Sequence, residues 1–273
     1  MSCRYDFLDG KLKGLERWFS DKDGAAVAFS GGVDSTLVAA VAARTLGNRA
    51  IAITLMTEFV GDWDIERAKK SAGEAGIRHE IIELRLPDKV LRNPQDRCYL
   101  CKYAMMKEIR DAAERCGVGL VVDGTNSDDL RAARPGIKAL RELGIRSPLA
   151  EVGISKKESY EISAMIGLSV EKVSNSCLAT RFPFGHRFTR EEGNMVERGE
   201  QFLRSRGFRT ARVRVIDLVA KIEVDPAEIG RAVDRDLREE IVEEFKKIGF
   251  RGVSLDLEGY RPGSMDYLES GSV

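Results

Sequence analysis

The chain has 273 residues, of which 43% are hydrophobic and 32% are charged, with 44 basic side chains against 44 acidic ones. This composition is typical of a globular protein that buries a core without disulfides or metal staples. The zero formal charge argues against non-specific binding to nucleic acid or to a membrane surface as the main activity. The first residues lack the apolar run of a secretory signal, and no stretch approaches the roughly 18 apolar residues of a membrane span, so we expect a cytoplasmic protein.

The first part of the chain alternates short apolar runs with helical stretches. In chain order, we expect a strand at 25–29, a helix at 36–44, a strand at 50–55, a helix at 65–75, a strand at 79–84, a helix at 100–116 and a strand at 119–123. Such alternation predicts a parallel sheet with helices on both faces. Ser155 and Glu158 then form a capping box, which begins a helix that Gly167 ends.

The α/β pattern stops near residue 174. A second capping box, Thr189 with Glu192, begins a helix that runs to about Arg206. Further elements are expected as strands at 211–216 and 219–224, a helix from Pro226 to just before Gly249, and a strand at 251–257. The predicted organisation is an α/β domain at 1–173, a connecting segment with little periodicity at 174–187, a small α+β domain at 188–262 and a loose tail at 263–273.

The sequence Ser-Gly-Gly-Val-Asp-Ser at 30–35 lies between the first expected strand and its helix. This places it at the carboxyl edge of a parallel sheet, where open α/β folds bind ligands. Backbone N–H groups at the start of a helix attract anions, adjacent glycines let a phosphate approach closely, and the two serines add hydroxyl donors. Asp34 would repel a phosphate unless a divalent cation bridged the two, so we expect Asp34 to bind Mg²⁺.

Two later segments fit the same edge of the sheet. Asp-Gly-Thr-Asn-Ser-Asp-Asp at 123–129 follows the fourth expected strand and offers a turn and carboxylates near a nucleotide. Lys156, at the start of the capped helix, could neutralise phosphate charge. Taken alone, the first segment is also explained as an Asx turn, and Lys156 as a solvated residue of a first helical turn.

The five cysteines do not suggest a disulfide framework, because their number is odd and the chain is large. Cys98 and Cys101 have the spacing of a shared metal or cluster site at the start of an expected helix. Zinc would need a second pair, whereas Cys177 as a third thiolate would suit a [4Fe-4S] cluster with one open iron. Two incidental thiols are the alternative, and we assign no role to Cys3 or Cys116.

Arg212 and Arg214 alternate with valines in an expected strand, so both guanidinium groups project from one face. Paired arginines at this spacing can bind a phosphate or a carboxylate. The alternative is that they form the solvent face of the strand and pair with Glu223 across the hairpin. Arg181 follows Cys177 closely in the sequence and would favour the thiolate form of that cysteine.

The sequence at 30–35 resembles the SGGxDS signature of the PP-loop ATP pyrophosphatases, which split ATP into AMP and pyrophosphate. Together with DGTNSDD at 123–129, a cysteine shortly before TRFPFG at 180–185, and GYRPG at 259–263, it resembles the LarE family over about residues 12–263. The resemblance implies an α/β fold of the PP-loop (adenine nucleotide alpha hydrolase-like) kind, with a parallel sheet between two layers of helices and a small C-terminal α+β domain.

The resemblance also implies an ATP-dependent sulfur transferase. Members of the family adenylylate a carboxylate of pyridinium-3,5-biscarboxylic acid mononucleotide, release pyrophosphate and form a thiocarboxylate for the nickel-pincer nucleotide cofactor. In one branch the cysteine matching Cys177 gives up its own sulfur, and in the other Cys98, Cys101 and Cys177 match ligands of a [4Fe-4S] cluster that carries the sulfide. Because this chain has all three cysteines, we expect the cluster form. We also expect a homo-oligomer, since known members are hexamers.

Individual residues follow from the same resemblance. Residues expected to bind ATP are Ser30, Gly31, Gly32, Asp34, Ser35, Gly124, Thr125, Asn126, Asp128 and Lys156. Residues expected to bind the substrate are Arg181, Glu200, Arg212, Arg214 and Arg261. Cys177 is the expected catalytic residue.

Three other functions are open on the sequence alone. A PP-loop tRNA thiolase also combines C-x-x-C with a distant cysteine, but it needs a basic RNA surface that a neutral chain does not suggest. We therefore expect a small-molecule nucleotide substrate and neither a nucleic-acid nor a membrane partner. An amide-forming ligase such as NAD synthetase uses the same adenylation but gives no reason for three cysteines. A regulator that only binds nucleotides would form no AMP.

Overall fold

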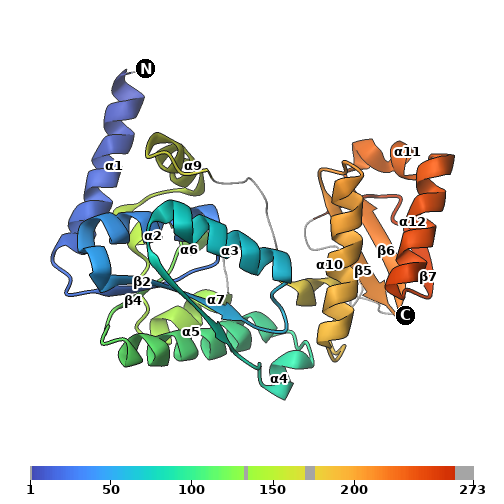
Figure 1. Ribbon diagram of the computed structural model, residues 1–273, viewed down its shortest axis with the longest axis horizontal. Coiled ribbons are helices and arrows are strands. Elements are labelled where there is room, and N and C mark those ends of the chain that lie inside the picture. Colours follow the sequence, from blue (N-terminus) through green and yellow to red (C-terminus); the bar gives the residue numbers. More distant parts are fainter. Residues whose placement is uncertain (1, 132–134, 170–175, 262–273) are drawn as a thin grey trace. The chain divides into compact units, whose positions relative to one another are not determined.

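The computed structural model describes residues 2–131, 135–169 and 176–261 (Figure 1). Contacts between residues divide the chain into two compact units. The first unit comprises Met1–Thr57, Asp62–Leu86 and Asp96–Ser174, and the second comprises Glu58–Gly61, Pro87–Gln95 and Asn175–Val273. The second unit thus takes two short segments from the part of the sequence that the pattern of elements places in the first domain. The expected tail at 263–273 lies outside the described residues.

The first unit is built on a four-stranded parallel sheet. Its strands are β1 (Ala25–Ala28), β2 (Ala50–Met56), β3 (Arg78–Glu83) and β4 (Val121–Val122), in the order β3-β2-β1-β4. In the register, Ala25 lies opposite Ala50, and Ile51 lies opposite Arg78. The predicted α/β fold with a parallel sheet is confirmed.

Helices cover both faces of this sheet (Figure 1). They are α1 (Ser2–Ser20), α2 (Val33–Leu46), α3 (Asp62–Ala75), α5 (Arg97–Arg115), α6 (Ser127–Arg131), α7 (Pro135–Glu142), α8 (Pro148–Val152) and α9 (Lys156–Met165), with a 3₁₀ turn η1 (Gly47–Arg49). The helices predicted at 36–44, 65–75 and 100–116 are present, and each begins three residues earlier than predicted. The capping box of Ser155 and Glu158 begins α9.

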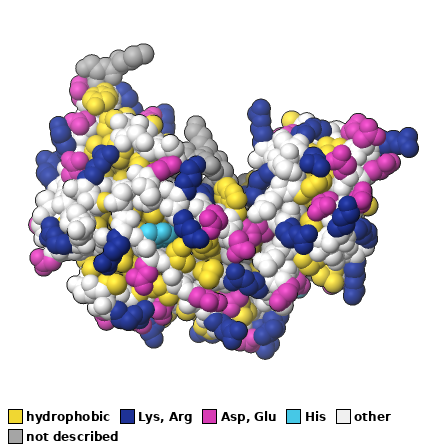
Figure 2. Space-filling view, in the orientation of Figure 1, with side chains coloured by type: hydrophobic (Ala, Val, Ile, Leu, Met, Phe, Trp, Pro, Cys, Tyr) yellow, Lys and Arg dark blue, Asp and Glu magenta, His cyan; other side chains and the backbone are white. Residues whose placement is uncertain are grey.

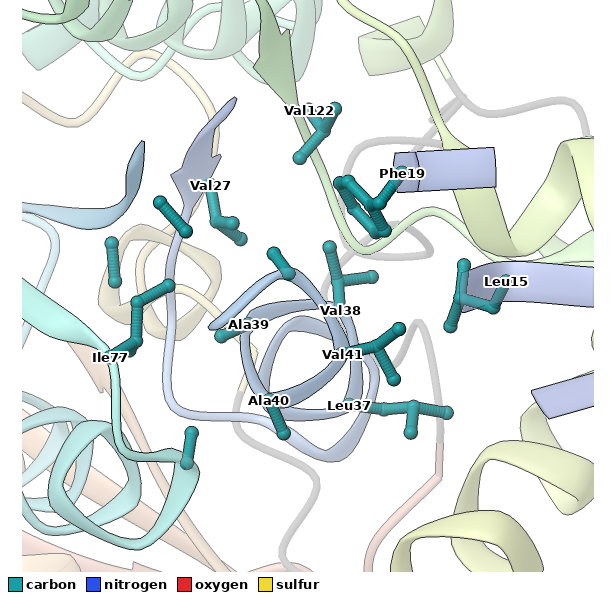
Figure 3. Packing of buried hydrophobic residues seen from close by; sticks show 14 of the residues in the cluster. Leu15, Phe19, Val27, Leu37, Val38, Ala39, Ala40, Val41, Ile77 and Val122 are labelled. Atoms are coloured by element: carbon teal, nitrogen blue, oxygen red, sulfur yellow. The ribbon is translucent and has the colours of Figure 1, made fainter. Parts of the chain in front are cut away.

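Side chains that alternate along the strands form two cores, one on each face of the sheet. Val27 of β1 belongs to the core that surrounds α2, where Leu37 is fully buried (Figure 3). The neighbouring Ala26 belongs to the opposite core, which α5 and α7 complete with Ile109 and Leu140. Because both faces are covered, β1, β2 and β4 are apolar at nearly every position, whereas the edge strand β3 is mostly polar.

Helix α1 is absent from the elements that the sequence analysis predicts. Leu15 and Phe19 of α1 are fully buried in the core around α2 (Figure 3). Lys11 Nζ donates hydrogen bonds to Glu158 Oε2 and to the Gly153 carbonyl, both at 2.6 Å. Helix α1 therefore covers the core and also braces the start of α9.

The second unit contains a three-stranded sheet in the order β5-β6-β7. Strands β5 (Ala211–Ile216) and β6 (Val219–Val224) are antiparallel, and β7 (Gly252–Leu255) pairs with β6 in parallel. The other elements are α4 (Asp88–Leu91), η2 (Leu178–Arg181), α10 (Arg190–Ser205), η3 (Pro226–Glu228), α11 (Ile229–Ala232) and α12 (Arg235–Ile248). A small α+β part is present, as the sequence predicts.

One element of the second unit differs from its prediction. The sequence predicts one helix from Pro226 to just before Gly249, whereas the structure divides this stretch into η3, α11 and α12. Asp234 interrupts it, because its side chain accepts a hydrogen bond from the Leu237 N–H at 3.5 Å. Aspartate is favoured as an N-cap and disfavoured within a helix, so a new helix begins after Asp234.

The surface of the described residues carries both signs of charge. On the face drawn in Figure 2, basic and acidic side chains are interspersed. This distribution agrees with the equal numbers of basic and acidic residues in the chain. Among the described helices, none combines the length and the apolarity that crossing a membrane requires.

Candidate functional site

Residues 30–35, which we call the glycine loop, connect the end of β1 to the start of α2 at the carboxyl edge of the sheet. Gly31 has φ of +68°, a left-handed conformation that glycine adopts without strain. A Cβ at Gly31 would lie 2.7 Å from the Cα of Ala68 in α3, so the close packing here leaves room only for hydrogen. The loop therefore runs tightly against α3 before α2 begins, where N–H groups of the first turn have no intrahelical partner.

Two serine hydroxyls hold the shape of the glycine loop. Ser35 Oγ lies 3.2 Å from Ser30 Oγ and donates to the Gly32 carbonyl at 3.1 Å. It also accepts the Ser30 N–H at 3.3 Å. Both serines are predicted to donate hydrogen bonds to a phosphate. Their observed hydrogen bonds hold the glycine loop against the start of α2.

The turn after β4 packs against the same helix start. A Cβ at Gly124 would lie 2.7 Å from the Ser35 nitrogen and 3.1 Å from the Asp34 carbonyl carbon. Asp123 is buried, and it shapes the turn by accepting hydrogen bonds from the Thr125 N–H at 3.1 Å and the Thr125 hydroxyl at 2.6 Å. The fold thus brings Gly124 and Thr125 to the glycine loop.

A lysine from α9 joins this group. Lys156 Nζ lies 2.6 Å from Asp34 Oδ2, and the Lys156 N–H donates to Asp128 Oδ2 at 2.9 Å. The other carboxylate oxygen, Asp34 Oδ1, is buried and has no hydrogen-bond partner among the described residues. Leaving a carboxylate oxygen buried and unpaired costs free energy, which a cation bound there would offset. Asp34 therefore has the chemistry that a Mg²⁺ ligand needs.

Asn126 caps the short helix α6 and is buried. Its Oδ1 accepts the N–H groups of Asp128 at 2.9 Å and Asp129 at 3.1 Å, while its own N–H donates to Asp129 Oδ2 at 3.2 Å. Asp128 in turn accepts the Lys156 N–H. The observed bonds of Asn126 and Asp128 therefore position the turn after β4 and the start of α9.

The two closely spaced cysteines lie at the start of α5, in the first unit. The Cys98 thiol is exposed, the Cys101 thiol is partly exposed, and Arg97 Nη2 donates to Cys98 Sγ at 3.9 Å. The next residue, Lys102, places its Nζ 3.5 Å from Asp123 Oδ2. This ion pair connects α5 to the turn that touches the glycine loop. Lys102 is not among the residues predicted from the sequence. Its position directly after C-x-x-C is the one signal that could have indicated a role in the site.

Cys177 lies in the second unit, exposed at the start of η2. Its carbonyl accepts hydrogen bonds from the Thr180 N–H at 3.0 Å and from Arg181 Nη1 at 3.2 Å. Arg181 is 1% exposed, and its Nη1 also donates to the carbonyl and hydroxyl of Ser176 at 2.9 and 2.6 Å. Arg181 thus holds the backbone around Cys177 in one shape.

Asn93, which the sequence analysis missed, anchors the segment that follows Cys177. It is fully buried with φ of +52°. Its side-chain Nδ2 donates to the backbone carbonyls of Ala179, Phe182 and Pro183 at 3.3, 3.2 and 2.8 Å. Its backbone carbonyl accepts the Gly185 N–H at 3.0 Å. Asparagine tolerates the left-handed region, but no sequence signal indicates which segment it holds.

Arginines and glutamates of the second unit, all buried except the partly exposed Arg204, form a charged cluster around β5. The members of this arginine cluster are Arg181, Glu200, Arg204, Arg212, Arg214 and Glu223. Glu200 is 2% exposed and receives Arg181 in a bidentate pair at 2.8 and 3.1 Å. Arg214 donates to Glu223 Oε2 at 3.0 Å. Among the described residues, four guanidinium groups surround two carboxylates, and Lys221 Nζ also lies 3.7 Å from Glu223, so this part of the cluster carries more positive than negative charge.

The arginine cluster shifts the pKa values of its members. Burial acting alone would raise the pKa of Glu200, but the charges of Arg181, Arg212 and Arg204 outweigh it and hold that pKa below its ordinary value. Burial, followed by the charge of Arg181, lowers the pKa of Arg212. Arginine nevertheless stays protonated in proteins, so an anion placed beside these side chains would relieve their mutual repulsion.

The strand alternation predicted for the two arginines is observed, but neither face of β5 is a solvent face. Arg212 is 6% exposed and Arg214 is 5% exposed, so the idea of a solvated arginine face is wrong. The pairing with Glu223 is present for Arg214. Arg261, by contrast, is exposed and pairs with Glu258.

Within residues 2–131, 135–169 and 176–261, no three His, Cys, Asp or Glu side chains form a group that could hold a metal ion. Cys98 and Cys101 belong to the first unit and Cys177 to the second. The set of three thiolates therefore stays a prediction.

A family model matches part of this chain, and several known proteins match almost its entire length. The family model described as asparagine synthase matches residues 19–140. An uncharacterized protein of Synechocystis is 42% identical, with 95% of this chain and 98% of the relative covered. An uncharacterized protein of Methanocaldococcus jannaschii is 32% identical, with 92% and 96% covered. The pyridinium-3,5-bisthiocarboxylic acid mononucleotide synthase of Lactiplantibacillus plantarum is 33% identical, with 95% of this chain and 92% of that protein covered.

The parallel sheet, the glycine loop at its carboxyl edge and the matching family model together define an enzyme of the ATP-using PP-loop class. The synthase of Lactiplantibacillus plantarum is 33% identical to this chain over nearly the full length of both proteins, which identifies one family within this class. The chain belongs to the LarE family, as its motifs predict.

Proposed function

We propose that this protein is an ATP-dependent sulfur transferase acting on pyridinium-3,5-biscarboxylic acid mononucleotide. It adenylylates a carboxylate of this substrate, releases pyrophosphate and forms a thiocarboxylate for nickel-pincer nucleotide biosynthesis. The similarity to the named synthase of Lactiplantibacillus plantarum supports the choice of substrate. The observation that carries the proposal is the contact of Lys156 with Asp34 beside the glycine loop, where Gly124 packs against the start of α2.

The glycine loop supplies the parts that ATP cleavage needs. The N–H groups at the start of α2 receive the phosphates, and the positive end of the helix dipole favours their charge. Asp34, whose buried Oδ1 has no partner among the described residues, would hold Mg²⁺, and the ion would supply charge stabilisation for the leaving pyrophosphate. Lys156 pairs with Asp34, and its side chain is 48% exposed, so it can turn toward a phosphate.

Adenylation makes the carboxylate reactive. A carboxylate oxygen attacks the α-phosphorus of ATP, the bond to the β-phosphate oxygen breaks, and pyrophosphate leaves with the electron pair. The resulting acyl-adenylate carries AMP as a good leaving group, so a sulfur nucleophile can attack the acyl carbon and expel AMP. Two easier steps thus replace the direct displacement of oxide.

The arginine cluster of the second unit binds the anionic part of the substrate in this proposal. Arg212 and Arg214 supply guanidinium groups that suit a phosphate, and the excess positive charge of the cluster favours a dianion. Arg181 and Glu200 act as positioning residues, because their observed bonds go to each other and to the backbone around Cys177. Arg261 is the remaining proposed substrate contact.

For the sulfur donor, we propose the form that uses Cys98, Cys101 and Cys177. The exposure of Cys98 and Cys177 and the partial exposure of Cys101 suit thiolates that bind a group from solution. A [4Fe-4S] cluster held by the three thiolates would supply a sulfide that can be replaced after each turnover. In the alternative form, Cys177 Sγ attacks the acyl carbon, and loss of the Cys177 Cα proton then breaks its Cβ–S bond and leaves dehydroalanine.

The test is anaerobic purification and reconstitution of the full chain, followed by iron and sulfide analysis and an assay with the dicarboxylate mononucleotide and ATP. We expect AMP and pyrophosphate to form only when the mononucleotide is present. Cys98→Ser, Cys101→Ser and Cys177→Ser should each lose bound iron, whereas the control Cys116→Ser should retain it.

The outcomes distinguish the two proposed sulfur donors and test the proposed substrate. Iron-free protein after reconstitution, with loss of sulfur from Cys177 during turnover, would replace the cluster form by the sacrificial one. ATP cleavage that does not respond to the mononucleotide would overturn the proposed substrate. A homo-oligomer, expected to be a hexamer, and a cytoplasmic location stay predictions, which sedimentation analysis and cell fractionation test.

A further inference from the structure

The first unit has a hollow at the edge of its sheet opposite the glycine loop. Its volume is about 610 Å³. It is lined by Gly24 directly before β1, Arg49 directly before β2 and Arg78 at the first position of β3. Because the strands are parallel, their amino ends share one edge, and the glycine loop follows the carboxyl end of β1 at the other. We call this hollow the amino-edge cavity, and the proposed reaction makes no use of it.

The lining of the amino-edge cavity is rich in positive charge. Its charged residues are Lys22, Arg49, Arg78 and Arg146, with Asp21 and Asp23 as the only acidic ones in the lining. The end of α5 also lies here, through Cys116 and Gly117. A helix C-terminus carries about half a negative charge, which a single cation is enough to balance. Four cations and two carboxylates leave the lining itself with a net charge of +2, and Glu80, whose Oε2 accepts a hydrogen bond from Cys116 Sγ at 3.8 Å, adds one carboxylate beside it.

Two of the four cations have carboxylate partners. Lys22 lies 2.5 Å from Asp21, and Arg146 forms a bidentate pair with Glu151, which is outside the lining. Arg49 behaves differently, because Nη1 donates to the backbone carbonyls of residues 22 and 23, both at 3.1 Å, and carbonyls do not neutralise its charge. Arg78 is exposed and forms no ion pair within the described part of the chain.

We propose that the amino-edge cavity binds a small phosphate-bearing anion through Arg49 and Arg78. A cavity of this size is in the range of small-molecule sites. Guanidinium groups suit phosphate oxygens because their N–H donors form a planar fork. The ligand is multivalent, because a single charge gains little from two exposed cations in water.

Cys116 makes this proposal directly measurable, because its thiol is exposed and lines the cavity. The probe is inorganic pyrophosphate, and the readout is the rate at which N-ethylmaleimide labels each cysteine of the full chain, resolved by peptide mass spectrometry. An anion bound beside the thiol blocks it and disfavours the thiolate. We expect pyrophosphate to slow labelling of Cys116 at least threefold at constant ionic strength. The rate of Cys116 labelling without pyrophosphate, at the same ionic strength, is the reference.

Matched variants locate the effect. Arg78→Gln and Arg49→Gln should each remove most of the protection, and Arg141→Gln, which deletes an exposed arginine outside the lining, should retain it. Citrate tests whether phosphate is needed, and we expect it to protect at least threefold less than pyrophosphate. The proposal is overturned if pyrophosphate gives no protection of Cys116, if citrate protects equally, or if all three arginine variants behave alike.

This experiment is independent of the proposed sulfur transfer. The labelling needs neither ATP nor the mononucleotide, so it succeeds or fails whether or not the chain forms a thiocarboxylate. Arg78→Gln should leave AMP formation unchanged, because the cavity and the glycine loop lie at opposite edges of the sheet.

Discussion

The two units of this protein place charge in opposite ways. In the first, the glycine loop relies on backbone N–H groups and on close packing at Gly31 and Gly124, with Asp34 and Lys156 as its main charged side chains. In the second, the arginine cluster buries five charged side chains around β5 and leaves Arg204 partly exposed. A site made from backbone stays folded when a charged side chain is removed, whereas a buried charge network does not. A substitution that removes a charge should therefore lower activity without lowering stability in the first unit. In the second unit it should lower both.

The largest expected effect is that of Glu200→Gln. This change leaves Arg181 buried without its carboxylate, so we expect the free energy of unfolding of the second unit to fall by about 3–5 kcal/mol. Hydrogen exchange of peptides from β5 and α10, read by mass spectrometry, measures the loss. Trp18 and Trp63 both belong to the first unit, so their fluorescence should show that unit unfolding as in the unchanged protein.

An exposed pair in the same unit provides the control. Glu243 and Lys247 form an ion pair on α12 in which both side chains are more than half exposed. Glu243→Gln should change the free energy of unfolding by no more than about 0.5 kcal/mol. Equal effects of the two substitutions would contradict the picture of a buried network.

Acid should destabilise the second unit through the same residue. The pKa of Glu200 is lowered in the folded protein, so its stabilisation is fully present above the unfolded-state pKa of about 4.3 and is lost as the pH falls through the lower folded pKa. We expect the protection of β5 and α10 against exchange, taken relative to the intrinsic exchange rate at each pH, to fall below about pH 4 in the unchanged protein. In Glu200→Gln this dependence on pH should be weaker, and an unaltered profile would remove Glu200 as its cause.

Asp34→Asn should affect activity and leave stability almost unchanged. Without the carboxylate charge, Mg²⁺ binding is weakened, and we expect AMP formation to fall at least about a hundredfold, or about 2.7 kcal/mol. The melting temperature should change little, because the amide keeps the shape of the carboxylate and the ion pair that is lost, with Lys156, is nearly half exposed on the lysine side. Glu66→Gln, an exposed change on α3, is the control for both measurements. Full activity in Asp34→Asn would contradict the proposed magnesium ligand.

Gly124→Ala tests the close approach of the two loops. The added Cβ would lie 2.7 Å from the Ser35 nitrogen, so the turn must move away from α2. We expect a loss of about 1–3 kcal/mol in stability and at least a tenfold fall in AMP formation. Gly73→Ala in α3 meets no atom within 4 Å and should leave AMP formation unchanged. If the two variants are equally active, the contact is unimportant for catalysis.

The smallest effect concerns α1. Gly10 lies inside this helix, and a Cβ there would meet no atom within 4 Å. Because alanine favours a helix over glycine, Gly10→Ala should raise the stability of the first unit by about 0.5–1 kcal/mol. Urea unfolding followed by tryptophan fluorescence measures the change, since Trp18 is in α1. A decrease in stability would mean that α1 is not a regular helix around Gly10.

The parts of the site that sequence reasoning found are short and contiguous. The glycine loop was recognisable because a strand, two glycines and a helix start follow one another directly. The capping box of Ser155 with Glu158 placed Lys156 at the start of α9, which the structure bears out. Lys102 and Asn93 were missed because their partners are far away in the sequence, at Asp123 and beyond Cys177.

Local patterns alone specified the alternation of strands and helices and the position of the loop between β1 and α2, because neighbouring residues decide secondary structure and turns. The burial of Arg212 and Arg214 could not be read in the same way, since alternation shows that two side chains share a face but not what covers it. Tertiary packing determined what covers the arginine face of β5, where α1 packs, and that Lys156 contacts Asp34. Each of these depends on distances between segments that only the folded chain brings together.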